Sequence, residues 1–123
     1  MHEASIAQSI LQIVTEKFEA TPHSSAALSV HIIVGQFRNV DIASLQFAFD
    51  SLRGLYRGCQ NCQLEAELIE AKAICLEQKH RYAPDFNHGF ACTICRGPIG
   101  KLVCGEELDV VNITLEANTI SKE

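Results

Sequence analysis

The sequence lacks the features that mark a membrane, secreted or nucleic-acid-binding protein. No apolar run reaches the ~18 residues that cross a bilayer, and "MHEASIAQSILQIV" has neither the basic region nor the cleavage site of a signal peptide. Ten Lys and Arg residues stand against fifteen Asp and Glu, and the basic ones are scattered, so no patch suits a phosphate backbone. We therefore expect a cytoplasmic protein with no membrane partner and no nucleic-acid partner.

Signatures of catalysis are also missing. The chain shows no set of nucleophile, base and orienting residue and no phosphate-binding loop, which gives little support to a hydrolase. It has no internal repeats and no low-complexity tract. What it does have is 123 residues, 47% of them hydrophobic, which is about one domain's worth with a modest core.

Hydrophobic periodicity predicts two helices and three strands. Apolar residues three and four apart over 4–19 predict an amphipathic helix that starts at about Ala4 or Ser5. Asp41 is a plausible N-cap for a second helix. Alternation predicts strands at 27–35, where Leu28 is one of the buried residues, at 64–73, and at 108–115, where a phase slip indicates a bulge. The predicted fold class is α+β, with two helices packed on a small three-stranded sheet and a zinc-knuckle insert before the last strand.

The insert, residues 74–104, differs in character from the rest. It is rich in cysteine, histidine, proline and glycine and has no sustained periodicity, so it needs another source of order. In a reducing compartment its cysteines are more plausible as metal ligands or thiols than as disulfides. We expect a body formed by residues 1–73 and 105–117, the insert at 74–104, and a loose tail at 118–123.

The motif Cys92-Thr-Ile-Cys95 has the form of a zinc knuckle. A structural zinc needs four ligands, and Cys75 is the natural third. The second cysteine of its pair is replaced by Gln78, whose neutral amide is a poor zinc ligand. His80 is the preferred fourth ligand; Cys104 and His88 are alternatives, and a weakened or absent site is another. A redox CxxC is the competing hypothesis, but nothing after the knuckle resembles the helix that follows a thioredoxin-like motif.

A second CxxC, Cys59-Gln-Asn-Cys62, stands in the turn that enters a predicted strand. We expect Cys62 to be an apolar strand residue and Cys59 to be a surface thiol. The alternative is that the two join a metal site.

The first three residues form a second candidate site. The α-amine of Met1, the amide and imidazole nitrogens of His2, and the amide or carboxylate of Glu3 can surround one cation in five- and six-membered chelate rings. Such a nitrogen-rich, near-planar set suits Ni(II) or Cu(II). The alternatives are that these side chains are merely solvated, or that Glu3 favours the positive end of the first helix.

"MHE" at the start, "FAF" in the second helix, the CxxC insert and the closing "CGEELDVVNITLE" together resemble the HypA/HybF family of nickel-incorporation proteins. The resemblance runs from residue 1 to about 116. It implies a nickel metallochaperone, not an enzyme, that works with a HypB-type GTPase. Its client would be the large subunit of [NiFe]-hydrogenase or, as in some organisms, the urease machinery, and the protein itself would be a monomer or a homodimer.

Carried over by position, the resemblance places Ni(II), as cargo, at Met1, His2 and Glu3. It places a structural Zn(II) at Cys75, Cys92 and Cys95, and the fourth family cysteine falls on Gln78, so His80 is the substitute we favour. The segment "GQFRNV" also departs from the family pattern, which indicates divergence within the family. A zinc-ribbon interaction module without a nickel role is the alternative function.

Overall fold

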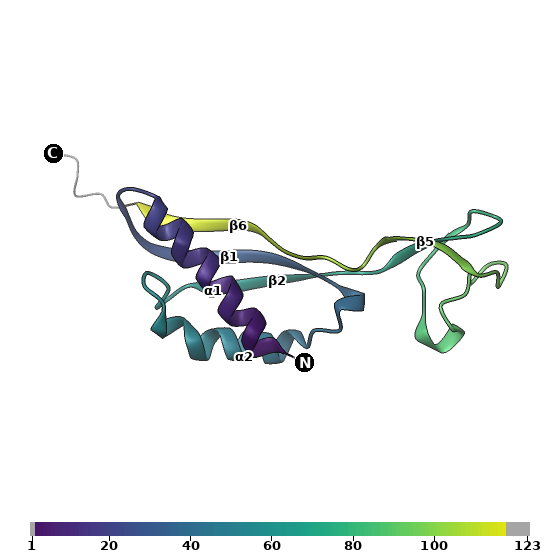
Figure 1. Ribbon diagram of the computed structural model, residues 1–123, viewed down its shortest axis with the longest axis horizontal. Coiled ribbons are helices and arrows are strands. Elements are labelled where there is room, and N and C mark those ends of the chain that lie inside the picture. Colours follow the sequence, from purple (N-terminus) through teal and green to yellow (C-terminus); the bar gives the residue numbers. More distant parts are fainter. Residues whose placement is uncertain (1, 118–123) are drawn as a thin grey trace. The chain divides into compact units, whose positions relative to one another are not determined.

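The computed structural model describes residues 2–117; the predicted loose tail, 118–123, lies outside the described residues. The helices and strands are α1 (Glu3–Ala20), β1 (Ser24–Gly35), α2 (Ile42–Leu52), β2 (Gln63–Ile69), β3 (Lys72–Cys75), β4 (Arg81–Tyr82), β5 (Ile99–Cys104) and β6 (Leu108–Ala117) (Figure 1). This mixed content of helices and strands confirms the predicted α+β class. No helix in the part of the chain that the structure describes is long and apolar enough to cross a membrane.

The chain divides into two compact units. The first, here called the body, comprises Met1–Ile32, Val40–Glu67 and Asp109–Glu123; the second, here called the cysteine unit, comprises Ile33–Asn39 and Leu68–Leu108. The cysteine unit is therefore wider than the insert expected at 74–104. Its additional segments are joined by the backbone: Gly35 N–H donates to the carbonyl of Glu107 at 2.6 Å, and Phe37 N–H donates to the carbonyl of Gly105 at 2.7 Å.

The body contains the two helices and the sheet of order β2-β1-β6 (Figure 1). Helix α1 begins at Glu3, directly after His2, and buries most of the face that its periodicity predicts, although Ile13, also expected there, is 44% exposed. Helix α2 begins where expected, because the Asp41 carboxylate accepts the Ser44 N–H at 3.2 Å. The buried side chains of the body are Ala7, Ile10, Leu11 and Val14 of α1, Leu45 and Phe49 of α2, Ala27, Val30 and Ile32 of β1, Leu64 of β2, and Cys59 and Cys62 of the turn between α2 and β2.

Three details of the strands differ from the sequence prediction. Leu28, expected in the core, is 43% exposed, because the buried residues of β1 change from odd to even positions between Ala27 and Val30. The strand expected at 64–73 is two strands: β2 ends at Ile69, and β3 belongs to another sheet. Along β6 the half-buried positions shift parity after Val110, as the phase slip indicated.

The cysteine unit has its own antiparallel sheet, of order β4-β3-β5, which the periodicity did not predict. Its strands are two, four and six residues long, too short to show alternation. Ala73, Cys75, Tyr82 and Cys92 form its buried cluster, and the half-buried Leu102 packs against them. With so few apolar side chains, the unit needs a further source of stability.

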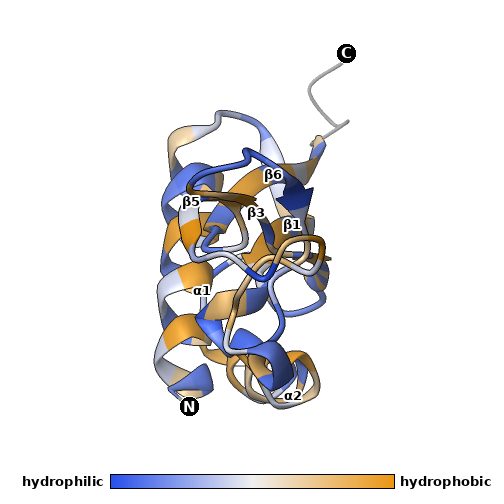
Figure 2. Cartoon of the chain, turned by 90° about the vertical axis from the view of Figure 1, so that its right-hand side faces the viewer, coloured by the Kyte–Doolittle hydropathy of each residue, from blue (hydrophilic) through white to orange (hydrophobic). Residues whose placement is uncertain are grey.

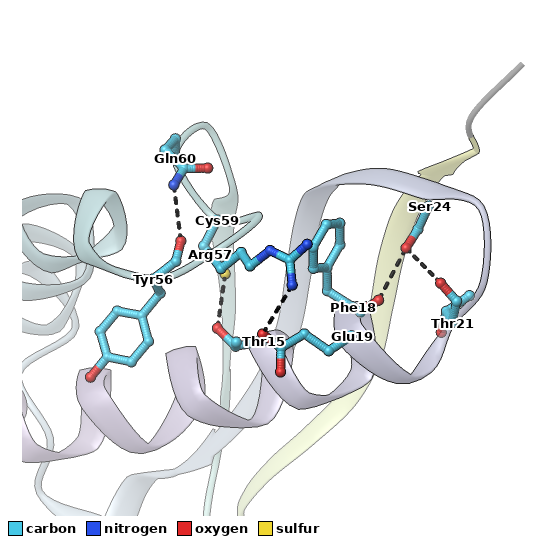
Figure 3. Close-up of polar contacts among 9 residues, drawn as sticks. All are labelled: Thr15, Phe18, Glu19, Thr21, Ser24, Tyr56, Arg57, Cys59 and Gln60. Atoms are coloured by element: carbon cyan, nitrogen blue, oxygen red, sulfur yellow. Dashed lines mark hydrogen bonds and ion pairs between the residues drawn. The ribbon is translucent and has the colours of Figure 1, made fainter. Parts of the chain in front are cut away.

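A turn between α2 and β2 packs against the C-terminal end of α1 (Figure 3). Gly58 has a φ of +84°, and its carbonyl accepts the N–H of Ala27 at 2.8 Å. The guanidinium of Arg57 lies 5.9 Å from the centre of the Phe18 ring and 3.6 Å from a carboxylate oxygen of Glu19. The turn therefore ties α1 to the start of the sheet.

We expect Gly58→Ala to destabilise the body. A Cβ there would lie 2.7 Å from the Phe18 ring, and the backbone conformation itself disfavours any side chain. The loss should be about 1–3 kcal/mol, measured by urea unfolding followed by circular dichroism. Gly54→Ala is the matched control, since a Cβ at Gly54 meets nothing within 4 Å. Equal stabilities of the two variants would contradict the expectation.

Candidate metal centre

Four ligand side chains converge in the cysteine unit. Cys75 ends β3, His80 follows the turn after it, and Cys92 and Cys95 belong to the knuckle before β5. Their sulfur and nitrogen atoms all lie within 4.8 Å of one another. The structure therefore brings together the four residues that the sequence favoured, although 20 positions separate the first from the last.

Backbone hydrogen bonds shape the knuckle. Arg96 N–H donates to the Cys92 carbonyl at 2.8 Å, and Arg96 has a φ of +64°, which turns the chain back. Cys92 N–H then donates to the Gly97 carbonyl at 2.9 Å. The resulting loop brings the sulfurs of Cys92 and Cys95 close to Cys75. The sulfurs of Cys95 and Cys75 are 3.9 Å apart.

The same loop favours the thiolate form of Cys92. Its sulfur accepts the N–H groups of Ile94 at 3.4 Å and Cys95 at 3.5 Å, and it lies 3.6 Å from Nδ1 of His80. Burial by itself raises the pKa of Cys92, but the N–H groups of Cys95 and Ile94 and the His80 ring together lower it to about 6. A thiolate is the form that binds a metal.

The donor set and its spacing fit zinc. Three sulfurs and one imidazole nitrogen are soft and borderline ligands, unlike the oxygens that magnesium and calcium require. With Zn–S bonds of about 2.3 Å, ligands at tetrahedral corners lie about 3.8 Å apart. The sulfurs of Cys95 and Cys75 are 3.9 Å apart, and Cys92 Sγ lies 3.6 Å from His80 Nδ1. These two distances match the spacing of ligands around a tetrahedral zinc, and all four atoms lie within 4.8 Å of one another.

The other candidates for the fourth ligand lie elsewhere. Gln78 is exposed in the turn after β3. The Cys104 thiol donates to the carbonyl of Glu70 at 3.3 Å, and the His88 ring lies 3.1 Å from the Asp85 carboxylate. None of these belongs to the cluster, so His80 is the residue that the fold supplies.

The second CxxC is not part of this centre. Cys59 and Cys62 are both fully buried in the body, so the expectation of a surface thiol at Cys59 is wrong, whereas the buried Cys62 agrees with the prediction. The Cys59 sulfur lies 3.6 Å from the Thr15 hydroxyl of α1 (Figure 3). Burial raises the pKa of both thiols, that of Cys62 to about 11, and a neutral thiol is a poor ligand. The two cysteines therefore contribute to the packing of the turn between α2 and β2.

The predicted nickel residues lie at the start of α1, in the body. His2 is exposed and immediately precedes the helix, while Glu3 is its first residue; Met1 is outside the described residues. The positive amino terminus, and next the N–H of Asp41, lower the pKa of Glu3 to about 2. The Asp41 N–H donates to the Glu3 carboxylate at 2.9 Å.

Asp41 is the residue that sequence reasoning missed here. It was identified only as the N-cap of α2, yet its backbone N–H also holds Glu3, 38 positions away. The starts of the two helices are therefore joined through Glu3. Among residues 2–117, the cysteine cluster is the one group in which three or more His, Cys, Asp or Glu side-chain ligand atoms come together.

An α+β body and a separate unit built on a Cys₃His cluster define a small metal-binding protein. The model of the HypA family, described as hydrogenase/urease nickel incorporation, metallochaperone, matches residues 1–115, and the chain belongs to this family.

Relatives and solved structures agree with this assignment. The hydrogenase maturation factor HypA of Chlorobium phaeobacteroides is 33% identical over 94% of this chain and 100% of that protein. The HypA of Synechococcus sp. is 30% identical over 94% and 87%. The guanidine hydrolase-activating protein A of Synechocystis sp. is 26% identical over 92% and 93%. The solution structure of the Ni metallochaperone HypA from Helicobacter pylori shares the fold, with a TM-score of 0.62 at 17% identity, covering 94% of this chain and 97% of that one.

Proposed function

We propose that this protein is a nickel metallochaperone that binds Ni(II) at its N-terminus and delivers it during maturation of [NiFe]-hydrogenase. The observation that carries the proposal is the family match over residues 1–115, which includes the "MHE" start. The nickel ligands would be the amine of Met1, His2 and Glu3. Zn(II) would be held structurally by Cys75, His80, Cys92 and Cys95. The protein itself would not be an enzyme.

The two kinds of metal require two kinds of site. The cysteine cluster offers four ligand atoms within 4.8 Å of one another, so a zinc bound by all four would have no open position and would not leave easily. Cargo has to be released, which favours ligands with few constraints. His2 is exposed and has no side-chain hydrogen bond to the helix it precedes. A site at this end of α1 can therefore open without disturbing the core.

The zinc-bearing segment, proposed at 74–104, would maintain shape and present a partner surface, while the body, proposed at 1–73 and 105–117, would carry nickel. The partners proposed are a HypB-type GTPase and the hydrogenase large subunit, with the urease machinery as a further client, in the cytoplasm. With one nickel site per chain, a monomer would deliver one nickel ion and a homodimer would deliver two.

Metal analysis of the untagged protein with a nickel titration tests the proposal. We expect about one zinc per chain as purified and one additional nickel bound on titration, with zinc retained. Calorimetry and X-ray absorption at both metal edges would measure the stoichiometry and the ligand types. Zinc without any nickel binding would favour the zinc-ribbon interaction module and would overturn the nickel role.

The Synechocystis relative favours a second client. It is named as an activator of guanidine hydrolase, and it matches this chain over nearly its whole length. A second candidate function is therefore nickel delivery to a hydrolase of that kind. Radioactive nickel loaded on this protein, offered separately to apo hydrogenase large subunit and to apo guanidine hydrolase, distinguishes the two: the true client takes up the label and gains activity.

A further inference from the structure

The sheet of the cysteine unit has one buried face and one open face. Ala73 of β3 is in register with Tyr82 of β4 and with Leu102 of β5, and this row belongs to the buried cluster. Successive residues of a strand point to opposite faces, and residues directly opposite each other in antiparallel strands share a face. The row that follows Ala73 must therefore lie on the open face.

That next row has an unusual composition. Ile74 of β3 is in register with Arg81 of β4 and with Lys101 of β5. Arg81 and Lys101 are exposed, and Ile74 is half-buried between them. Two cations thus flank an apolar side chain, and their backbones are separated by two strand spacings, about 10 Å.

Neither cation has a counter-ion in the described part of the chain. No ion pair within 4.0 Å joins Arg81 or Lys101 to a carboxylate there, and neither side chain has another polar or ring contact in that part of the chain. Two carboxylates of the unit are engaged with other cations: Glu70 lies 3.3 Å from the ammonium of Lys72, and Asp85 lies 3.1 Å from the ring of His88. The open face is therefore positive at its two sides.

Strand β5, an edge strand of this sheet, also carries exposed apolar residues. Val103, two residues after Lys101, is 40% exposed; Ile99 is 40% exposed as well, but a register shift places it opposite Cys75. In Figure 2, hydrophobic segments in orange lie beside hydrophilic segments in blue around β3 and β5. Exposed apolar residues next to unpaired cations offer a partner both apolar area to bury and charge to complement.

We propose that this row, Arg81, Ile74 and Lys101, is a docking surface for an acidic segment of a partner protein. The segment would be extended and would present two carboxylates with an apolar side chain between them. In an extended chain, residues i, i+2 and i+4 share one face and span about 13 Å, which suits cations about 10 Å apart on flexible arms. The carboxylates pair with the cations, and the apolar residue covers Ile74. The surface contains no ligand of either metal site, so it is tested independently of nickel binding.

The probe is the peptide ESVSE, which carries this pattern, titrated into the full-length, zinc-loaded, isotope-labelled protein and followed by amide chemical shifts. We expect the largest shifts at β3, β4 and β5. The double variant Arg81→Glu/Lys101→Glu should bind about tenfold or more weakly, since two ion pairs become repulsions. The matched control is Lys17→Glu/Lys79→Glu, which changes the net charge equally and should bind within about twofold of the wild type. Zinc content, measured in every variant, reports that the unit is folded.

Three outcomes would overturn the proposal. The first is equal binding of the peptide by the Arg81→Glu/Lys101→Glu variant and the wild type. The second is equal binding of KSVSK, the peptide with its charges reversed. The third is binding to phosphatidylserine vesicles, or salt-sensitive self-association of the chain, through the same residues while the peptide does not bind. Each result assigns the face to something other than an acidic protein segment.

Discussion

Removing zinc from this protein, by a chelator or by Cys92→Ser, is expected to unfold the cysteine unit and leave the body folded. The unit's buried cluster contains only Ala73, Cys75, Tyr82 and Cys92, and two of these four are proposed metal ligands. A cluster of this size offers little hydrophobic stabilisation, whereas zinc bound by four ligands contributes roughly 10–16 kcal/mol. Most of the unit's stability would therefore come from the metal.

Hydrogen exchange measured by NMR distinguishes the two units. After zinc removal, the amides of β3, β4 and β5 should lose protection, while those of α1 and α2 should keep theirs, because their core is built from the buried side chains of the helices and β1. Cys104→Ser is the matched control: its thiol reaches only the carbonyl of Glu70, so zinc and protection should both remain. Protected strands in a zinc-free protein would show that the cluster is not the source of order.

The parts of the fold that sequence reasoning predicted are those with long periodic segments. Helices α1 and α2 follow from apolar spacing and from the Asp41 cap, and β1 follows from alternation over several residues. The sheet β4-β3-β5 escaped prediction because a two-residue strand such as β4 carries no period. The break between β2 and β3 was also missed. There the N–H of Ala71 donates to the side-chain oxygen of Gln36 at 2.8 Å, a contact between positions 35 apart.

In the candidate site, too, short-range spacing predicted some features, whereas contacts between residues far apart in the sequence were missed. The spacing of Cys92 and Cys95, and the closeness of His80 to Cys75 along the chain, were enough to nominate the four residues that the fold brings together. The surroundings of Cys59 were not readable, because its burial depends on a turn that docks on α1 at Thr15, 44 positions earlier. The contact of Glu3 with Asp41 is equally long-range.

The second large effect is expected at the proposed nickel site. His2→Ala should abolish measurable nickel binding and leave zinc and fold intact. The imidazole is the one strong side-chain nitrogen ligand of the proposed set, since Met1 contributes its amine and Glu3 at most a carboxylate or an amide. Changing residues that merely orient a metal ligand typically costs 10–100-fold in affinity, so loss of a direct ligand should cost about 100-fold or more. Isothermal calorimetry on untagged, zinc-loaded protein measures it.

Two further variants separate the role of the side chain from that of the terminus. His23→Ala removes another exposed histidine of the body and should bind nickel as the wild type does. A Gly-Ser extension before Met1 retains His2 and Glu3 but moves the free amine two residues away, and should lose nickel as completely as His2→Ala. If the extended chain bound nickel with unchanged affinity, the amine would not be a ligand. If His2→Ala bound it unchanged as well, nickel would have to bind elsewhere. Loss in both variants, with zinc retained, would require that the histidine act together with the amine beside it.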